Sequence, residues 1–272
     1  MVEQGKLTRR ELLRMSAGAL LAAGLWPGRL RAAGAGDAGE FWFCAVNDLH
    51  FAEAECAKYL AKAIAQMKAS APALAFCLVA GDLSDHGKPQ ELAEVRDVLK
   101  ALDGRERVVI GNHDWLEHSD RKAYEENFPG QLNYRFKEQG WQVLGLDTTE
   151  GRKSSGTTVQ PAALAWLDKT LPKLDRKRPL VVFTHFPLGP EVKMRPKNAD
   201  DLLARFKEHN LLAVFNGHFH GFTERRMGET VLTTNCCCAS NKGNHDGTKA
   251  KGFFLCHAKD GNIERTFVEV KP

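Results

Sequence analysis

Five short polar clusters along the chain combine carboxylate, imidazole and carboxamide side chains, and each directly follows an apolar, strand-like run. These side chains offer oxygen and nitrogen ligands without a thiolate, a set suited to manganese, iron or zinc ions. The spacings Asp-x-His and His-x-His are informative, because residues i and i+2 of an extended strand end point to the same side. The clusters are Asp48-Leu49-His50, Gly81-Asp82-Leu83-Ser84-Asp85, Gly111-Asn112-His113-Asp114, Thr184-His185-Phe186 and Gly217-His218-Phe219-His220.

Each cluster taken alone has an ordinary structural explanation. An aspartate before an apolar helix can cap its first turn, one histidine can satisfy a loop carbonyl, and Gly-Asn or Gly-Asp pairs are common in turns. Five clusters that each follow a strand indicate a joint site instead, because ligands of open α/β sheets bind outside the carboxyl ends of the strands. The sequence therefore predicts a metal site at one sheet edge.

The elements that must position these clusters alternate between short apolar runs and helical patterns, which is typical of an α/β sheet. Strands are predicted at 41–46, 75–80, 108–110, 141–146, 180–184 and 211–215, and helices at 53–69, 89–102, 161–170 and 199–209. From residue 221 onward the pattern predicts antiparallel strands, at 222–227, 230–235, 252–257 and 262–270. No linker divides the sequence, so one α/β domain over residues 36–272 is expected.

The ordered set D-x-H, G-D-x-x-D, G-N-H-D, H and G-H-x-H resembles the signature of calcineurin-like metallophosphoesterases, from residue 41 to the C-terminus. The short, single-domain form is similar to the bacterial cyclic-nucleotide phosphodiesterase branch. The resemblance implies a four-layer α-β-β-α sandwich with two mixed sheets, and two metal ions bridged by one carboxylate. Asn47, where Ser or Thr is more usual, is the one visible departure. The implied ligands are Asp48, His50 and His220 for one ion, Asn112, His185 and His218 for the other, and Asp82 as the bridge.

This resemblance implies a metal-dependent phosphoesterase that hydrolyses a phosphodiester or phosphomonoester. Two cations about 3.5–4 Å apart neutralise phosphate oxygens and prepare a water held between them for in-line attack. His113 is not assigned to a metal, so it is available to donate a hydrogen bond to the phosphate or to protonate the leaving oxygen. Asp85 and Asp114 are candidate partners that orient the imidazoles, with loop capping as the alternative for both.

Two polar, glycine-bearing segments, 151–158 and 241–251, are predicted to be loops that overhang the site and select the substrate. His245 lies in the second of them and is assigned to this substrate-side loop. Surface or packing positions are expected for His86, His118, His209 and His257, which have no motif partner.

The seven cysteines show no CxxC spacing, so they indicate neither a disulfide framework nor a zinc knuckle. Most are expected to be small buried side chains. The run Cys236-Cys237-Cys238 lies on an apparent strand, where three neighbours cannot face the same way. A structural role is favoured for this run, and one disulfide or a reactive thiol is the alternative.

The N-terminus combines paired arginines with a short apolar run. Arg9 and Arg10 precede the weakly apolar residues 15–26, and the small residues 32–35 follow. This 12-residue run falls short of the about 20 residues that span a bilayer. The order resembles a twin-arginine export signal over residues 1–35, which predicts a periplasmic or other extracytoplasmic protein that meets the membrane only before cleavage. A short amphipathic helix and an uncleaved anchor are the alternatives.

The charge balance bears on the partner. Removing the six basic and two acidic residues of 1–35 from totals of 38 and 34 leaves 32 of each sign. Such a chain lacks the broad basic field that supplies sequence-independent affinity for nucleic acid. A small phosphoester is therefore the expected substrate, and no specific nucleic-acid partner is expected. The alternatives are a binding-only protein with this fold, an exported nuclease or lipid phosphoesterase, and a closed structural metal site.

Overall fold

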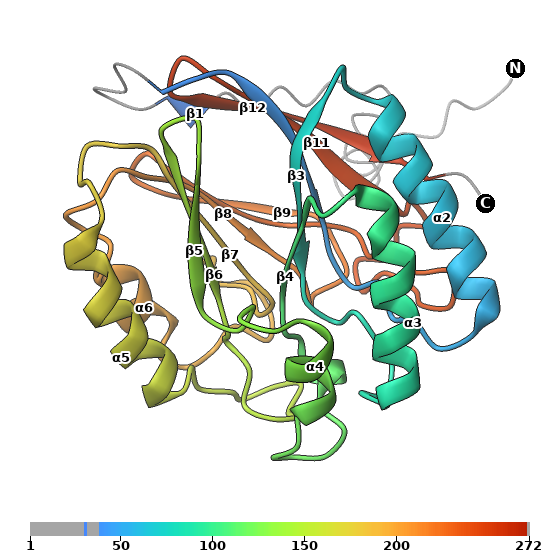
Figure 1. Cartoon of the computed structure of the whole chain (residues 1–272). Coiled ribbons are helices and arrows are strands. Elements are labelled where there is room, and N and C mark those ends of the chain that lie inside the picture. The colour runs from blue at the N-terminus through green and yellow to red at the C-terminus, as the bar shows by residue number, and fades with distance from the viewer. Residues whose placement is uncertain (1–29, 32–37, 271–272) are drawn as a thin grey trace, which may run out of the picture.

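The computed structural model describes residues 30–31 and 38–270 (Figure 1). The predicted export signal, residues 1–35, lies outside these ranges except for strand β1 (Leu30–Arg31), which pairs antiparallel with strand β12 (Asn262–Glu269). Among the described helices, none combines the length and the apolar character of a membrane span.

The described strands form two mixed sheets of six strands each. The first contains β2 (Phe41–Val46), β3 (Leu74–Ala80), β4 (Glu106–Val109) and β11 (Gly252–Lys259), in the order β1-β12-β11-β2-β3-β4. The second contains β5 (Tyr134–Glu138), β6 (Trp141–Leu146), β7 (Leu180–Thr184), β8 (Leu211–Asn216), β9 (Thr223–Met227) and β10 (Thr230–Thr234), in the order β5-β6-β7-β8-β10-β9. In the first sheet β2, β3 and β4 run parallel, and β11, β12 and β1 continue the sheet with antiparallel pairings. In the second sheet β6, β7, β8 and β10 run parallel, and the edge strands β5 and β9 are antiparallel to their neighbours.

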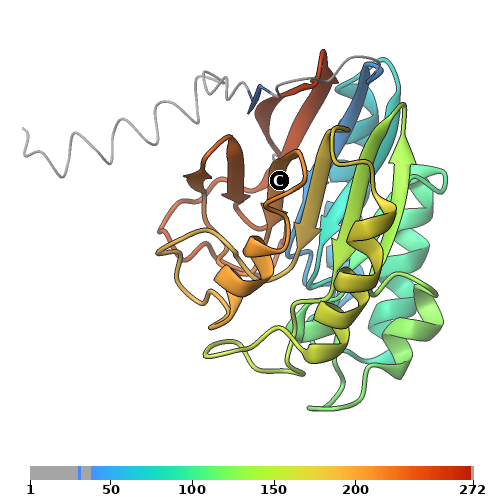
Figure 2. The ribbon, with the colours of Figure 1, turned by 90° about the vertical axis from the view of Figure 1, so that its left-hand side faces the viewer.

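Helices cover the outer face of each sheet, as the two views show (Figures 1 and 2). Helices α2 (Ala54–Ala69), α3 (Pro89–Leu99) and α4 (Lys122–Asn127) lie on the first sheet, and α5 (Pro161–Thr170) and α6 (Ala199–Ala204) on the second. Apolar side chains between the two sheets, such as Phe43, Phe76 and Phe183, form the central core. This α-β-β-α order confirms the predicted fold class.

Helix α2 shows why these residues form helices against the sheet. Its buried side chains recur three or four positions apart, at Leu60, Ile64 and Met67, which gives one apolar stripe that faces β2 and β3. Helix α3 begins with Pro89 at its first position, where the missing amide hydrogen costs nothing and the fixed φ suits a helix.

Two predicted helices are shorter than expected. The segment predicted at 89–102 is α-helical only to Leu99, because the backbone tightens into a 3-10 turn (Lys100–Leu102) before the left-handed residue Asp103. The segment predicted at 199–209 leaves the α-helix after Ala204, since the backbone N–H groups of residues 205, 206, 207 and 209 bond to carbonyls three positions back. The apolar spacing is kept in both segments, and only the hydrogen-bond pattern differs.

Two elements carry no clear sequence signal. Strand β5 is an edge strand that alternates apolar and polar residues, but it has only five residues and all are at least partly exposed, so the pattern is too short to identify a strand. Helix α4 has only six residues, too few to show a helical period. Both elements are therefore recognised from their packing on neighbouring segments, such as that of Tyr134 and Phe136 against the central core.

Candidate metal centre

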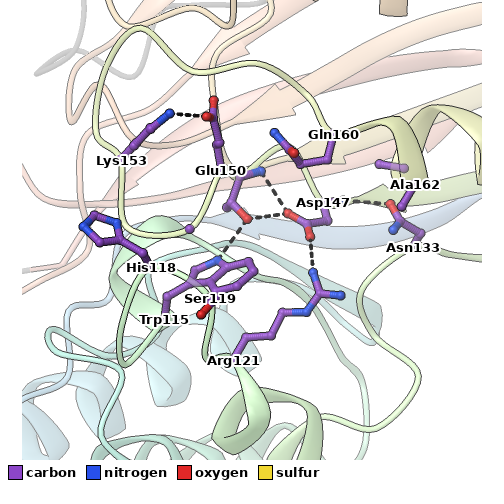
Figure 3. Close-up of a pocket in the computed structure, with 13 residues that line it drawn as sticks. Trp115, His118, Ser119, Arg121, Asn133, Asp147, Glu150, Lys153, Gln160 and Ala162 are labelled. Atoms are coloured by element: carbon purple, nitrogen blue, oxygen red, sulfur yellow. Dashed lines mark hydrogen bonds and ion pairs between the residues drawn. The ribbon is translucent and has the colours of Figure 1, made fainter.

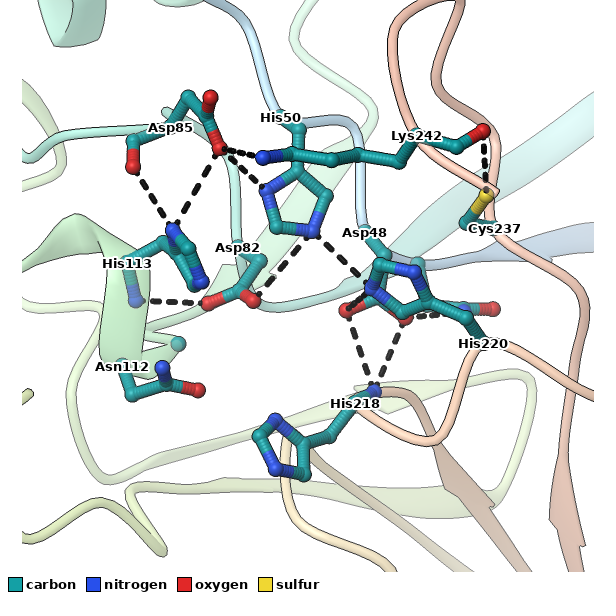
Figure 4. Close-up of polar contacts among 12 residues, drawn as sticks. Asp48, His50, Asp82, Asp85, Asn112, His113, His218, His220, Cys237 and Lys242 are labelled. Atoms are coloured by element: carbon teal, nitrogen blue, oxygen red, sulfur yellow. Dashed lines mark hydrogen bonds and ion pairs between the residues drawn. The ribbon is translucent and has the colours of Figure 1, made fainter. Parts of the chain in front are cut away.

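The five predicted clusters meet at one end of the sandwich (Figure 4). The loops after β2, β3 and β4 of the first sheet face those after β7 and β8 of the second. Each strand is parallel to its neighbour in this set, so the carboxyl ends lie at the same edge. Except for His113, the polar side chains of these clusters are almost fully buried, and such burial requires partners or a bound cation.

The first group of ligand atoms comes from Asp48, His50, Asp82 and His220, and these atoms all lie within 4.8 Å of one another. Nε2 of His50 lies 3.0 Å from Nε2 of His220 and 3.5 Å from Oδ2 of Asp82. Nε2 of His220 lies 3.3 Å from Oδ1 of Asp48.

The hydrogen bonds made by the Nδ1 atoms of His50 and His220 determine the protonation of the Nε2 atoms, which face the centre of the group. Nδ1 of His50 donates to Oδ1 of Asp85 at 3.0 Å, and Nδ1 of His220 donates to the carbonyl of Gly243 at 3.1 Å. In the neutral rings both Nε2 atoms therefore carry lone pairs, which face each other. Opposed lone pairs repel unless a shared cation lies between them, so this group fits a metal ion.

The second group comes from Asp82, His185 and His218. Nε2 of His185 lies 3.0 Å from Oδ1 of Asn112, 3.1 Å from Nδ1 of His218 and 3.3 Å from Oδ1 of Asp82. Nδ1 of His185 donates to the carbonyl of Ala80 at 2.9 Å, and Nε2 of His218 donates to that of Ser154 at 2.7 Å. The inner nitrogens again present lone pairs to a common point, which fits a second ion.

Asp82 lies between the two groups. Its Oδ2 faces His50 and its Oδ1 faces His185, and Oδ1 also accepts a hydrogen bond of 2.8 Å from the backbone N–H of His113. Burial raises the pKa of Asp82, but the nearby His185 and His50 outweigh it and hold the pKa well below its usual range. One carboxylate anion therefore serves both groups.

The carboxylates make both groups attractive to positive charge. Burial lowers the pKa of His220, but the charge of Asp48 and a hydrogen bond to it prevail and raise the pKa to about 11. Burial likewise lowers the pKa of His185, but Asp82 and Asp48 raise it to about 9. A proton and a metal ion therefore compete for the same inner nitrogens.

Backbone conformation sets the direction of these side chains. Asp48, His50, Asp82, His218 and His220 have φ values of 55°, 44°, 51°, 66° and 45°, in the left-handed region. A residue other than glycine pays about 1–3 kcal/mol to stay there, so the surrounding structure must impose it. The extended geometry expected for the Asp-x-His and His-x-His pairs is therefore wrong. Asp48 and His50 still reach one group, whereas His218 and His220 reach different groups.

Three motif glycines make room for the ligands. A Cβ on Gly81 would lie 2.5 Å from Nδ1 of His185, and one on Gly217 would lie 2.8 Å from Oδ2 of Asp48. A Cβ on Gly111 would lie 2.1 Å from both the backbone N and Oδ1 of Asp82. These glycines allow the loops from different strands to approach closely enough for their ligands to converge.

Replacing Gly111 with alanine is expected to displace Asp82 and so weaken both groups at once. Steric overlap of this kind costs about 1–3 kcal/mol of folding stability. We expect fewer than two bound ions per chain and a lower Tm, measured by plasma mass spectrometry and calorimetry. Gly243→Ala is the matched control, because a Cβ there meets no atom within 4 Å. Wild-type metal content and Tm in the Gly111 variant would contradict this account.

The two candidate orienting carboxylates have different contacts. Asp85 contacts Nδ1 of His50 and also accepts from Nζ of Lys242 at 2.7 Å. Burial raises the pKa of Asp85, but His50 and Lys242 outweigh it and keep the pKa well below its usual range. Asp114 instead accepts from the backbone N–H groups of Ser84 and Gly111, both at 2.8 Å. The structure thus places Asp85 against an imidazole and Asp114 in a loop-capping position.

His113 lies beside the two groups with about a third of its side chain exposed. Its Nδ1 donates to the carbonyl of Asp85 at 2.7 Å, which turns Nε2 toward the cavity (Figure 4). The cavity above the two groups has a volume of about 420 Å³. Its lining consists of His50, Asp82, His113, Ser154, Met194, His218, His220, Lys242, Gly243, Asn244 and His245.

Several of these lining residues carry no recognisable sequence signal. Ser154 and Gly243 act through backbone carbonyls, which any residue type can supply. Lys242 is one lysine among many. The sequence indicates only the segments in which these three residues lie. Ser154 belongs to segment 151–158, and Lys242 and Gly243 belong to segment 241–251, both predicted to overhang the site. His245, also in that region, stacks on His220 with ring centroids 5.1 Å apart.

A larger cavity of about 640 Å³ lies nearby and contains none of the predicted ligands (Figure 3). Its charged side chains are already paired. Arg121 contacts Oδ2 of Asp147 at 3.0 Å, and Lys153 contacts Glu150. Trp115 donates from Nε1 to Thr149 at 3.0 Å. Judged by volume alone, this cavity would be the candidate active site. The smaller cavity is the better candidate, because the inward-facing lone pairs of the histidines lie at its floor.

The remaining histidines have structural contacts outside the metal groups. Nδ1 of His86 lies 2.8 Å from Oε1 of Glu91, and the ring of His257 stacks on Trp42 with centroids 4.0 Å apart. His209 contacts the carbonyl of Leu171 through Nε2 at 3.1 Å. His118 lines the larger cavity.

The cysteines correct one expectation. Cys236, Cys237 and Cys238 follow strand β10 in irregular backbone rather than lying on it. All seven cysteines are buried free thiols, so the alternative of a disulfide is wrong. Burial raises the pKa of Cys236 and of Cys238 to about 12, which keeps both as thiols near neutral pH.

The fold consists of two mixed sheets, and its candidate site has one carboxylate shared between two buried groups of imidazoles. This combination is typical of proteins that bind two metal ions side by side. The chain belongs to the calcineurin-like phosphoesterase family, whose model matches residues 41–222.

Two curated relatives, both named as probable phosphodiesterases, are similar to part of this chain. A probable glycerophosphodiester phosphodiesterase of Arcobacter nitrofigilis is 28% identical over 171 residues, which cover 57% of this chain and 59% of the relative. A probable cyclic nucleotide phosphodiesterase of Rhodopseudomonas palustris is 28% identical over 203 residues, which cover 65% of this chain and 71% of the relative. The match with the first relative thus spans less than two thirds of that protein's length.

Solved structures show the same fold at low sequence identity. A purple acid phosphatase from yellow lupin superposes with a TM-score of 0.63 and 13% identity, covering 88% of this chain and 53% of that one. A putative 5'-nucleotidase from Staphylococcus aureus superposes with a TM-score of 0.55 and 14% identity, covering 86% and 55%.

Proposed function

We propose that the protein is a metal-dependent hydrolase of small phosphodiesters. One observation carries this proposal: Asp82 joins two groups of inward-facing lone pairs at the floor of an open cavity. A cavity of about 420 Å³ suits a small molecule rather than a polymer. Two relatives named as probable phosphodiesterases support the choice of a diester.

The proposed ligands follow from the two groups of atoms. Oxygen and imidazole donors without thiolate suit manganese, iron or zinc. When bound, such a pair of ions supplies charge neutralisation for phosphate oxygens and an activated water. The residues proposed to hold the ions are Asp48, His50 and His220 for one, Asn112, His185 and His218 for the other, and Asp82 for both.

The chain's own residues supply orientation and proton transfer. Asp85 holds the ring of His50 through Nδ1, and the carbonyls of Ala80, Ser154 and Gly243 hold three other rings. The Asp85 carbonyl fixes Nδ1 of His113, so a second proton on this ring sits on Nε2, which faces the cavity. From there His113 donates to the leaving oxygen as it departs.

Hydrolysis of two chromogenic esters tests this function. Metal-analysed protein is assayed with bis(p-nitrophenyl) phosphate and p-nitrophenyl phosphate, with and without added manganese. We expect the diester to be hydrolysed faster. Preference for the monoester would contradict the choice of diester. Turnover of neither ester by metal-replete protein would contradict hydrolysis and favour the binding-only alternative.

We also propose that the protein is exported through the twin-arginine route. Arg9 and Arg10 ahead of a short apolar run support this proposal. That route carries folded proteins, which suits a metal centre loaded before export. Replacing both arginines with lysine is expected to retain the protein in the cytoplasm, as measured by cell fractionation. Arg14→Lys is the control for charge-conserving change, and equal export of all three forms would contradict the proposal.

A further inference from the structure

Lys242 extends into the metal cavity from the loop between β10 and β11 (Figure 4). Its backbone is held in place, because its carbonyl accepts from Nζ of Lys251, and the neighbouring Asn241 donates to the carbonyl of His50 at 3.1 Å. The side chain is 30% exposed, so the ammonium can meet a ligand in the cavity. The loop thus presents a cation from a fixed position.

The ammonium of Lys242 retains hydrogen-bonding capacity toward the cavity. Among the described residues it contacts one acceptor, Oδ1 of Asp85, at 2.7 Å. An ammonium has three N–H donors, so this contact leaves two. Asp85 also faces His113, whose Nδ1 lies 3.4 Å from the same oxygen. Lys242 is the only Lys or Arg among the described residues that line this cavity.

Hydrolysis of a phosphodiester creates a need for such a cation. A water oxygen forms the new bond to phosphorus, the bond to the leaving alcohol oxygen breaks, that oxygen takes one proton and a second proton is released. The phosphoryl group changes from a monoanion in the diester to a dianion in the monoester product. A donor that binds more strongly as this charge develops accelerates the reaction.

We propose that Lys242 is a catalytic residue that donates a hydrogen bond from Nζ to a non-bridging phosphoryl oxygen. This inference rests on the proposed function and adds a residue to it. The contact with Asp85 aims the ammonium at the same end of the cavity as His113. The two residues then have different roles. His113 protonates the leaving oxygen, and Lys242 donates a hydrogen bond to an oxygen that stays on phosphorus.

A purely structural role for Lys242 predicts a different outcome. If the lysine only held Asp85, its loss would disturb His50 and lower metal occupancy. Metal content and phosphate affinity, measured on the same samples, separate the two roles. Lys249→Ala is the matched control, because it removes the same charge from the same loop at an exposed position outside the cavity lining.

The test uses metal-loaded wild type, Lys242→Ala, Lys242→Arg and Lys249→Ala. We expect Lys242→Ala to keep two ions per chain, to bind inorganic phosphate about 10- to 100-fold more weakly by calorimetry, and to lose kcat by a similar factor on bis(p-nitrophenyl) phosphate. The arginine variant should recover part of both losses, and Lys249→Ala should match wild type.

Two results would overturn the role of Lys242. One is wild-type phosphate affinity and kcat in Lys242→Ala, and the other is loss of metal with unchanged phosphate affinity per loaded site. Failure of the proposed function looks different, because wild-type protein with two ions would then hydrolyse neither ester. The phosphate affinities of the four proteins still test Lys242 in that case.

Discussion

Replacing Asp82 with asparagine is expected to weaken both metal sites together, by at least about 100-fold in affinity. The carboxylate faces His50 through one oxygen and His185 through the other, so neutralising it removes an anionic ligand from each group. Turnover of bis(p-nitrophenyl) phosphate should fall to background. Calorimetric titration with manganese and metal analysis after dialysis measure the effect. Asp97→Asn is the control, since Asp97 is an exposed residue of α3 that pairs with Arg96 of that helix and with Lys100 of the following 3-10 turn.

The Asp82 variant also tests whether the two metal sites lose affinity together or separately. A shared bridge predicts that neither site keeps wild-type affinity. Loss of one ion with the second retained at wild-type affinity would assign Asp82 to a single group, and the two groups would then be independent sites.

Replacing His113 with alanine is expected to lower kcat by about 10²- to 10⁴-fold while both ions stay bound. The His113 ring lies edge-on to His50, with ring centroids 4.7 Å apart, but its Nδ1 is engaged by the Asp85 carbonyl and its Nε2 faces the cavity. Stopped assays on metal-analysed protein measure the loss. His118→Ala is the matched control, because His118 is an exposed histidine outside the lining of this cavity.

The comparison between the two variants tests the division of roles. Asp82→Asn should lose metal and activity, whereas His113→Ala should lose activity alone. Equal metal loss in both variants would contradict the role given to His113.

The convergence of the candidate residues could be predicted from the sequence where residue type carries the chemistry. Asp48, Asp82 and His185 each follow an apolar run that becomes a strand, and parallel strands bring such positions together without any knowledge of the loops. The glycines of the motifs were visible too. Their purpose, the close approach of one loop to a ligand of another, is visible only in three dimensions.

The parts that the sequence did not predict depend on the backbone. The left-handed conformations of His218 and His220, which send neighbouring motif residues to different groups, follow from the fold rather than from the residue types. The carbonyls of Ser154 and Gly243 orient two rings, and no side-chain identity signals them. The edge strand β5 was not predicted, because five partly exposed residues give too short a pattern, and its pairing with β6 is visible only in three dimensions.

Anomalous diffraction from crystals of manganese-loaded protein would locate the proposed ions. We expect two peaks about 3.5–4 Å apart, both in contact with Asp82. One peak should also contact Asp48, His50 and His220, and the other Asn112, His185 and His218. A single peak, or two peaks that do not share Asp82, would show that the chain does not hold two ions bridged by this carboxylate.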